Sequence, residues 1–456
     1  MKFVMLLFFF IVIVMILIMK EPQRTVWLFV GVLTLTDSIE IGPINAYTLY
    51  LVAFIASLYI HGEIKQEWND FPFKGILVIL LLLHTAVALH DGRIHDNPIR
   101  MASRIFNNYV PRYLALFVGY AALNNLKDWR KIMMPLFTIF AFMGIYGVFT
   151  WYLQGNPYYE MMNGVFRGKA GIWTEVQSRG YRVMSTLTNP IVYSFVMCMA
   201  GHFIFLWRKS MNFVPWVCLL SLVILNAFLA NSRTGMVAGL LLVFLFLLSK
   251  YRLSWRIYAS ITMCLLTFSV AYFTIPQIRN VSDSVIDIIA SGGNQTEGSN
   301  VTLKLNQMKA SAYFFAKSPL FGNGFHYFSE VLLRKDISYT GGTLAGLEGY
   351  GYKLLVEEGL FMILGVSVFF FRLCTYFFRR RYLGIYAHAG IAWTVSFLAF
   401  LMFAGEYGGV FTIGILLIGM LLKFIQQYEI LYLNTCLQCS CIHRSMSGQH
   451  IGTDGE

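Results

Sequence analysis

Charged side chains are scarce in this 456-residue chain, where Asp, Glu, Lys and Arg make up only 13%. A soluble domain needs roughly 25% charged residues to cover its surface. The hydrophobic fraction is instead 57%, with 40 Phe and 26 Tyr, and the mean hydropathy is +0.62. Lipid must therefore cover much of the molecule, which excludes a soluble globular fold and favours an integral membrane protein.

Acidic residues are outnumbered by basic ones, and the formal net charge is +12. No soluble basic domain is visible, so we expect contact with anionic lipid or an anionic substrate rather than nucleic acid. Cysteine residues are few, and none of the seven falls in a loop expected on the outer side of the membrane, so no disulfide framework is predicted. The tail pattern of Cys436, Cys439, Cys441 and His443 could bind zinc, but a lone cluster is a weak signal and we assign no metal site.

Long apolar runs recur along the whole chain, and a membrane-spanning helix needs about 20 such residues. The first run, 3–19, resembles a signal peptide but lacks a cleavage site, so we interpret it as a retained helix. The second run is short, and the segment 37–45 could be a re-entrant turn. An all-α polytopic fold with about 12–14 transmembrane helices is predicted, with spans near 3–19, 25–37, 45–60, 75–90, 109–124, 132–153, 190–207, 213–230, 235–249, 257–275, 354–372, 384–404 and 408–424.

Basic groups at alternate helix ends predict the orientation of these spans. The groups are Lys127/Arg130/Lys131, Arg208/Lys209, Lys250/Arg252/Arg256 and Arg372/Arg379/Arg380/Arg381, and all fall on one side, which we take as cytoplasmic. The predicted parts are ten helices within 1–275, a large outer loop at 276–353 with an amphipathic helix from Val301 to Lys317, further spans at 354–424 and a cytoplasmic tail at 425–456. No internal repeat is visible.

Many arginines and lysines nevertheless fall on the outer side, against the positive-inside rule. Long loops translocate regardless of charge, which accounts for most of them. Arg182 and Arg233 abut spans, where a misplaced arginine costs about 2.5–3.5 kcal/mol on insertion scales, so they are functional candidates. His84 and His90, near one helix end, are expected to be interfacial.

Three outer segments could carry chemistry. They are Arg179–Asn189 before Pro190, the turn Asn231–Gly235, and Pro319–Phe325 together with Glu348–Leu360. Arginine forks bind phosphate oxygens bidentately, so two arginines from separate helix ends could clamp a pyrophosphate while Glu348 takes a proton from an attacking hydroxyl. Simpler interpretations stay open: Arg233 could be a snorkelling turn residue, Gly322-Asn323-Gly324 a plain turn, and Glu357-Glu358 a solvated helix start.

At these residues the sequence resembles the bacterial O-antigen ligase and O-antigen polymerase family over roughly 175–365. The motifs match in order: Arg182, Asn189-Pro190, Ser232-Arg233-Thr234-Gly235, Pro319…Gly322-Asn323-Gly324 and Glu357-Glu358-Gly359. The resemblance implies a GT-C-like architecture with one large periplasmic loop, in the bacterial inner membrane, with the active site facing the periplasm. The family's loop histidine falls on Glu348 here, which favours a polymerase over a ligase, and its loop arginine falls on Lys304.

The resemblance implies an inverting, metal-independent glycosyltransferase that needs no cofactor and joins undecaprenyl-pyrophosphate-linked repeat units of a surface polysaccharide. Arg182 and Arg233 would act on the pyrophosphate, and Glu348 would be the catalytic base. Arg179, Lys304, Gly322, Gly324 and Glu358 would bind substrate, with Glu358 also the reserve base. A protein that regulates chain length is a further candidate partner. The alternatives are an O-antigen ligase with lipid A core as acceptor, and a flippase for lipid-linked sugar.

Overall fold

The structure is a computed structural model of the chain. It describes residues 2–34, 40–41, 44–94, 97–123, 126, 129–166, 175–176, 180–250, 273, 279, 283, 301–332, 349–405 and 409–448. The predicted span 257–275 and most of the segment that joins it to residue 300 lie outside these residues, as do Arg179 and Glu348.

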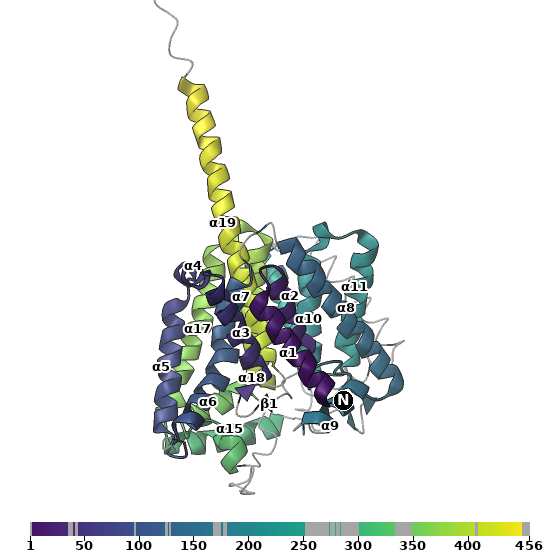
Figure 1. Cartoon of the computed structure of the whole chain (residues 1–456), viewed down its shortest axis with the longest axis vertical. Helices are drawn as coiled ribbons and strands as arrows, with labels where there is room; N and C mark the ends of the chain where they lie inside the picture. The colour runs from purple at the N-terminus through teal and green to yellow at the C-terminus, as the bar shows by residue number, and fades with distance from the viewer. Residues whose placement is uncertain are drawn as a thin grey trace, which may run out of the picture.

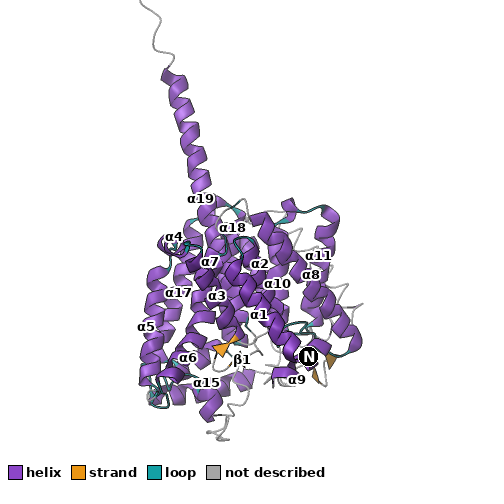
Figure 2. Ribbon diagram, in the orientation of Figure 1, coloured by secondary structure: helices purple, strands orange, loops and turns teal. Residues whose placement is uncertain are grey.

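Helices make up nearly all of the described chain, and they pack side by side into one bundle (Figures 1 and 2). Two strand pairs accompany them, β1 (Glu40–Ile41) with β2 (Ile44–Asn45) and β3 (Glu175–Val176) with β4 (Gly180–Tyr181), both antiparallel. The helices are α1 (Lys2–Ile18), α2 (Gln23–Thr34), α3 (Ala46–Ile60), α4 (Ile64–Asp70), α5 (Lys74–His90), α6 (Pro98–Tyr109), η1 (Val110–Leu114), α7 (Ala115–Ala121), α8 (Trp129–Leu153), α9 (Pro157–Phe166), α10 (Pro190–Leu206), η2 (Arg208–Ser210), α11 (Phe213–Leu229), α12 (Arg233–Lys250), α15 (Val301–Lys317), η3 (Phe328–Leu332), α16 (Tyr350–Glu357), α17 (Gly359–Arg379), η4 (Arg381–Leu383), α18 (Ile385–Ala404) and α19 (Val410–Gly448).

Length and composition allow four of the described helices to cross a bilayer: α8, α17, α18 and the part of α19 from Val410 to Asn434. Helices α3 and α4 meet at 109° and would form a fifth span if they act as one. Shorter apolar helices of 10–17 residues complete the set, at Leu6–Ile18, Lys74–His90, Pro190–Leu206, Phe213–Leu229 and Arg233–Ser249. The predicted all-helical, multi-span membrane fold is confirmed.

The bundle has two distinct ends (Figure 1). The C-terminal part of α19 projects beyond one end, the tail side, whereas α6, α9 and α15 lie at the opposite end, the loop side. Aromatic rings place other segments on the tail side: the Phe424 ring centroid lies 4.7 Å from that of Trp129 and 5.7 Å from that of Trp207. Arg380 pairs there with Glu429 at 2.8 Å. The basic residues that adjoin Trp129, Trp207 and Arg380 therefore share the tail side.

The core is built around α19, which α7 crosses at very close range. A Cβ atom added to Gly119 of α7 would overlap the carbonyl of Leu416, and one added to Gly419 of α19 would overlap the carbonyl of Leu116. Glycine at both positions lets the two backbones touch, which is how small residues drive helix association where lipid removes the hydrophobic effect.

Helix boundaries differ from the predicted spans at three places. The span predicted at 109–124 consists of the π-turn η1 followed by the short helix α7, and the π-turn contains Pro111, which lacks the N–H that a regular α-helix needs. The span predicted from 354 begins at Gly359, since a break separates it from α16. The last span does not end near 424 but continues as helix to Gly448. The amphipathic helix predicted from Val301 to Lys317 is present as α15.

Candidate functional site

A break separates α16 from α17 on the loop side, where α16 packs on α15. Glu358 separates the two helices, and Gly359, the first residue of α17, has φ +74°, a conformation that glycine adopts without strain. The turn 318–324 lies against this break through backbone hydrogen bonds. Asn323 N donates to Val356 O at 2.9 Å, and Leu360 N donates to Pro319 O at 2.9 Å. These bonds seat the turn on the helix break.

Two glycines allow that close approach. Gly322 and Gly324 have φ +70° and +95°, in the left-handed region that favours glycine. A Cβ on Gly322 would overlap the carbonyl of Glu357, and one on Gly324 would overlap the carboxylate of Asp91. The segment is therefore a turn whose glycines pack against two other parts of the bundle.

A buried ion pair lies beneath the turn. Arg112 Nη1, from η1, donates to Glu358 Oε1 at 2.8 Å, and the two side chains are only 7% and 2% exposed. His84 Nε2, from α5, lies 3.5 Å from Glu358 Oε2, while His84 Nδ1 lies 2.8 Å from Leu80 O. The expectations of a solvated Glu358 and an interfacial His84 were wrong, because both side chains are buried.

Aromatic rings enclose this pair. The His84 ring stacks on Phe325 of the turn with centroids 5.7 Å apart and planes at 18°. The hydroxyl oxygens of Tyr113 and Tyr350 lie 2.6 Å apart, and the Arg112 guanidinium lies 5.6 Å from the centroid of the Tyr350 ring. The cluster thus joins α5, η1, the turn and α16 into one unit, in which each charge has an opposite or aromatic neighbour.

Glu357, the neighbour of Glu358, holds a different part of the same unit. Its Oε1 atom accepts a hydrogen bond of 3.0 Å from Phe328 N at the start of η3, and its carbonyl accepts one of 2.9 Å from Gly324 N. Both acidic residues are buried; Glu357 bonds directly to the loop segment 318–332, whereas Glu358 reaches it through His84, whose ring stacks on Phe325. Their shared effect is to position that segment over the helix break.

The two candidate arginines belong to a second group: Arg182 lies in the segment before α10, and Arg233 begins α12. Arg182 is buried, and the next residue, Val183, donates its N–H to Leu229 O at 3.2 Å. Arg233 is the first residue of α12, where Ser232 Oγ accepts a hydrogen bond of 3.2 Å from Gly235 N, as a helix N-cap does. The segment before α10 and the turn that carries Arg233 therefore pack together.

Helix ends strengthen the case for an anion here. Asn189 caps α10 by accepting a hydrogen bond of 2.8 Å from Ile191 N. A Cβ on Gly235 would lie 2.6 Å from Ser194 Cβ, so α12 begins in close contact with α10. Helix N-termini carry partial positive charge, which adds to that of the two arginines. Of the other predicted residues, Lys304 lies in α15 with its side chain undescribed, and Arg179 and Glu348 lie outside the described residues.

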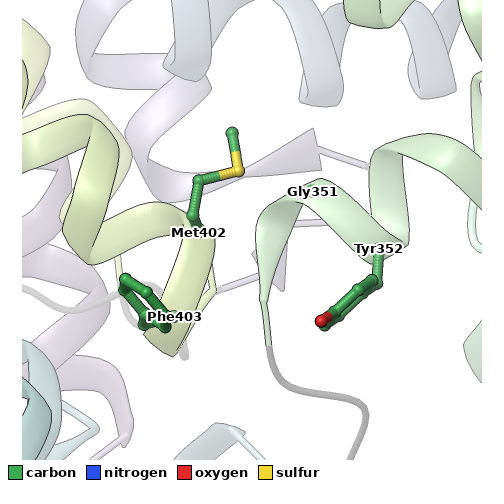
Figure 3. A pocket seen from close by; sticks show the side chains of 4 residues that line it. All are labelled: Gly351, Tyr352, Met402 and Phe403. Atoms are coloured by element: carbon green, nitrogen blue, oxygen red, sulfur yellow. The ribbon is translucent and has the colours of Figure 1, made fainter. Parts of the chain in front are cut away.

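A pocket of about 250 Å³ lies between α16 and α18, lined by Gly351, Tyr352, Met402 and Phe403 (Figure 3). Met402 and Phe403 project from α18 and Tyr352 from α16. Helix α16 also packs on α15 and η3, whereas α18 packs on α12, which begins with Arg233. The pocket therefore sits where the elements of the two groups meet.

The helical bundle defines a multi-span membrane protein that has a group of paired basic and acidic side chains on its loop side. The model of the O-antigen ligase family matches residues 216–348 of the chain. The match includes the Arg233 turn, α15 and the turn 318–324. A search of curated proteins found no match.

The family covers both ligase and polymerase members, which are membrane glycosyltransferases that act on lipid-linked glycans. The resemblance inferred from the sequence is confirmed at this level. Arg112, His84 and Tyr113 were missed as part of the site. A signal was present, since Arg112 follows Pro111 within a predicted span, where an arginine is costly unless it is paired.

Proposed function

We propose that the chain is a polymerase that joins undecaprenyl-pyrophosphate-linked repeat units of a surface polysaccharide. The loop side then faces the periplasm of a bacterial inner membrane. The observation that carries the proposal is that the segment carrying Arg182 bonds through Val183 N to Leu229 O, just before the turn from which Arg233 begins α12, with Arg233 inside the residues matched by the O-antigen ligase model. Two guanidinium forks, one of them at the positive N-terminus of α12, suit a pyrophosphate, and the apolar bundle suits its lipid.

In the proposed reaction, a sugar hydroxyl of one lipid-linked unit attacks the anomeric carbon of another. The new glycosidic C–O bond forms as the bond to pyrophosphate breaks, and the lipid pyrophosphate leaves with the electron pair. The configuration at the anomeric carbon inverts. Arg182 and Arg233, with Arg179 and Lys304 assisting, would stabilise the charge that develops on the pyrophosphate. The hydroxyl proton passes to a carboxylate base.

Glu348 is the proposed base. It directly precedes Gly349, where an added Cβ would lie 2.7 Å from Met402 O, beside the pocket between α16 and α18. The Tyr352 ring in that pocket offers an aromatic face to an acceptor sugar. Glu358 is less suited to proton transfer because Arg112 pairs with its carboxylate. We therefore assign Glu358, with Gly322 and Gly324, to positioning the loop.

Chain-length profiling of the surface polysaccharide in cells tests the proposal. Arg233→Ala should abolish long chains at unchanged protein level, because one of the pyrophosphate forks is lost. Arg208→Ala is the matched control, since Arg208 is an exposed arginine on the tail side with its guanidinium 5.1 Å from the Trp216 ring. Normal long chains in Arg233→Ala would refute the proposed role.

The same experiment distinguishes the second candidate. The matching family model is described as an O-antigen ligase, which favours transfer of the glycan to lipid A core as the alternative. A cell that lacks a polymerase still shows a single repeat unit on the core, whereas a cell that lacks a ligase shows none. The pattern left by Arg233→Ala therefore decides between them.

A further inference from the structure

Three arginines converge on one carboxylate at the loop side. Arg93 precedes α6, Arg100 and Arg104 lie one turn apart on α6, and all three reach Glu330 of η3. The N–O distances from Arg93 and Arg100 to Glu330 Oε2 are both 3.6 Å, longer than a hydrogen bond, while Arg104 contacts Oε1 directly. One carboxylate thus lies near three guanidinium groups but forms a hydrogen bond with only one of them, that of Arg104.

Arg93 is the anchored member of this cluster. Asp91 accepts from its Nε at 2.8 Å and from its Nη2 at 2.7 Å, and Phe325 O accepts from the same Nη2 at 2.8 Å. Its Nη1 atom is buried and has no hydrogen-bond partner among the described residues. Asp91 and Phe325 therefore hold the guanidinium of Arg93 in place. Its Nη1 atom lies near the Glu330 carboxylate, which Arg100 and Arg104 also approach.

The cluster is accessible and carries excess positive charge. The Arg100 side chain is 48% exposed, and those of Arg93, Arg104 and Glu330 are partly exposed. Asp91 and Glu330 are the carboxylates that pair with the three arginines among the described residues, so one positive charge remains. A phosphate offers three oxygens in place of the two of Glu330, and arginine forks match that geometry.

The position separates this cluster from the Arg182 and Arg233 group. Helix α6 packs on α5, η1 and β2, whereas α12 packs on α10, α11 and α18. A polymerase brings together two lipid-linked molecules, and each carries its own pyrophosphate. We propose that Arg93, Arg100 and Arg104 bind the pyrophosphate of the acceptor, with Glu330 occupying the site in its absence. This proposal rests on the polymerase function, in which Arg182 and Arg233 hold the donor.

The test uses the purified full chain in nanodiscs of zwitterionic lipid, so that no anionic phospholipid can supply the phosphate. A radiolabelled donor is transferred to one of two acceptors, the lipid-pyrophosphate-linked repeat unit or the same oligosaccharide ether-linked to the same lipid. The measured quantity is the preference for the pyrophosphate acceptor. Arg100→Gln and Arg104→Gln should each lower it about tenfold, the order expected for one charge-assisted hydrogen bond. Arg208→Gln should leave it unchanged.

Glu330→Gln separates a binding site from a structural contact. If Glu330 competes with the phosphate, its neutralisation raises the preference for the pyrophosphate acceptor. If the cluster only fastens the loop, Glu330→Gln and the arginine variants all lower transfer to both acceptors equally, which would overturn the proposal, as would a wild-type chain without any preference. Binding of sugar-free polyprenyl pyrophosphate is measured in parallel in an Arg233→Ala background. If the wild type makes no glycosidic bond, the polymerase function fails. The binding of polyprenyl pyrophosphate then still shows whether the arginine cluster is a pyrophosphate site.

Discussion

Removing the carboxylate of Glu358 should strongly destabilise the protein. Its partner Arg112 lies 2.8 Å away with a side chain only 7% exposed, so Glu358→Gln leaves a buried guanidinium without its counter-charge. Breaking such a pair costs about 3–5 kcal/mol, because the remaining ion has lost its solvation and its partner. Equilibrium unfolding in mixed micelles, followed by tryptophan fluorescence, measures the change in the free energy of unfolding.

Two other ion pairs of the same length serve as controls. Arg380 and Glu429 are also 2.8 Å apart, but their side chains are 25% and 19% exposed, so Glu429→Gln should cost no more than about 1 kcal/mol. Lys423 and Glu67 are also 2.8 Å apart and are as buried as the Arg112 pair. They lie on the tail side, however, because Glu67 belongs to α4 and Lys423 to the part of α19 beside it. Glu67→Gln should therefore destabilise like Glu358→Gln yet keep long polysaccharide chains at matched protein level.

A compensating substitution sharpens the test. Arg112→Met combined with Glu358→Met replaces both charges by flexible apolar side chains and should recover most of the lost stability, because no buried ion remains. The double variant should still lack normal chains if the ion pair positions the loop. A cost for Glu358→Gln no larger than that for Glu429→Gln would refute the reasoning.

Three further outcomes follow from the packing. Gly322→Ala should lower the free energy of unfolding more than Gly62→Ala does. Both glycines have positive φ, which costs alanine about 1–2 kcal/mol, but only at Gly322 does the new methyl group meet backbone atoms, which adds about 1–3 kcal/mol. Gly322→Ala should also shorten the polysaccharide chains seen on gels. Gly119→Ala should lower the melting temperature because the added methyl group overpacks α7 against α19. Gly75→Ala, with open space around it, should raise the free energy of unfolding by up to about 1 kcal/mol. Equal melting temperatures for the two variants would contradict the close crossing of α7 and α19. Arg233→Lys keeps the charge but loses the fork, so we expect initial polymerisation rates to fall about tenfold, and a wild-type rate would show that charge alone suffices.

Much of the bundle could be predicted from the sequence because apolar length alone decides which segments enter a membrane. Helix α15 was predicted with its bounds because Ser318-Pro319 ends it. The break at Gly359 was missed, since hydropathy does not register a left-handed glycine inside an apolar stretch. The extension of α19 to Gly448 was missed for a related reason, as its outer part is helical without being apolar enough to span.

The site was only partly predictable. Arg182 and Arg233 stood out because they adjoin spans on the side where arginine is disfavoured. The partnership of Arg112 with Glu358 could not be found, because the two residues are 246 positions apart and meet only through tertiary packing. Arg93, Arg100 and Arg104 were attributed to ordinary loop charge, and only the approach of Glu330 from the late loop reveals them as a cluster.

The most direct measurement is the fate of the lipid pyrophosphate in a reconstituted reaction. Purified protein in vesicles is given undecaprenyl-pyrophosphate-linked repeat units, and both free undecaprenyl pyrophosphate and glycosidic bonds are counted. A polymerase that holds the donor through Arg182 and Arg233 releases one lipid pyrophosphate for each bond formed, and Arg233→Ala abolishes both products together. Movement of the intact lipid-linked units across the vesicle membrane without bond formation or pyrophosphate release would contradict glycosyl transfer and indicate a transporter.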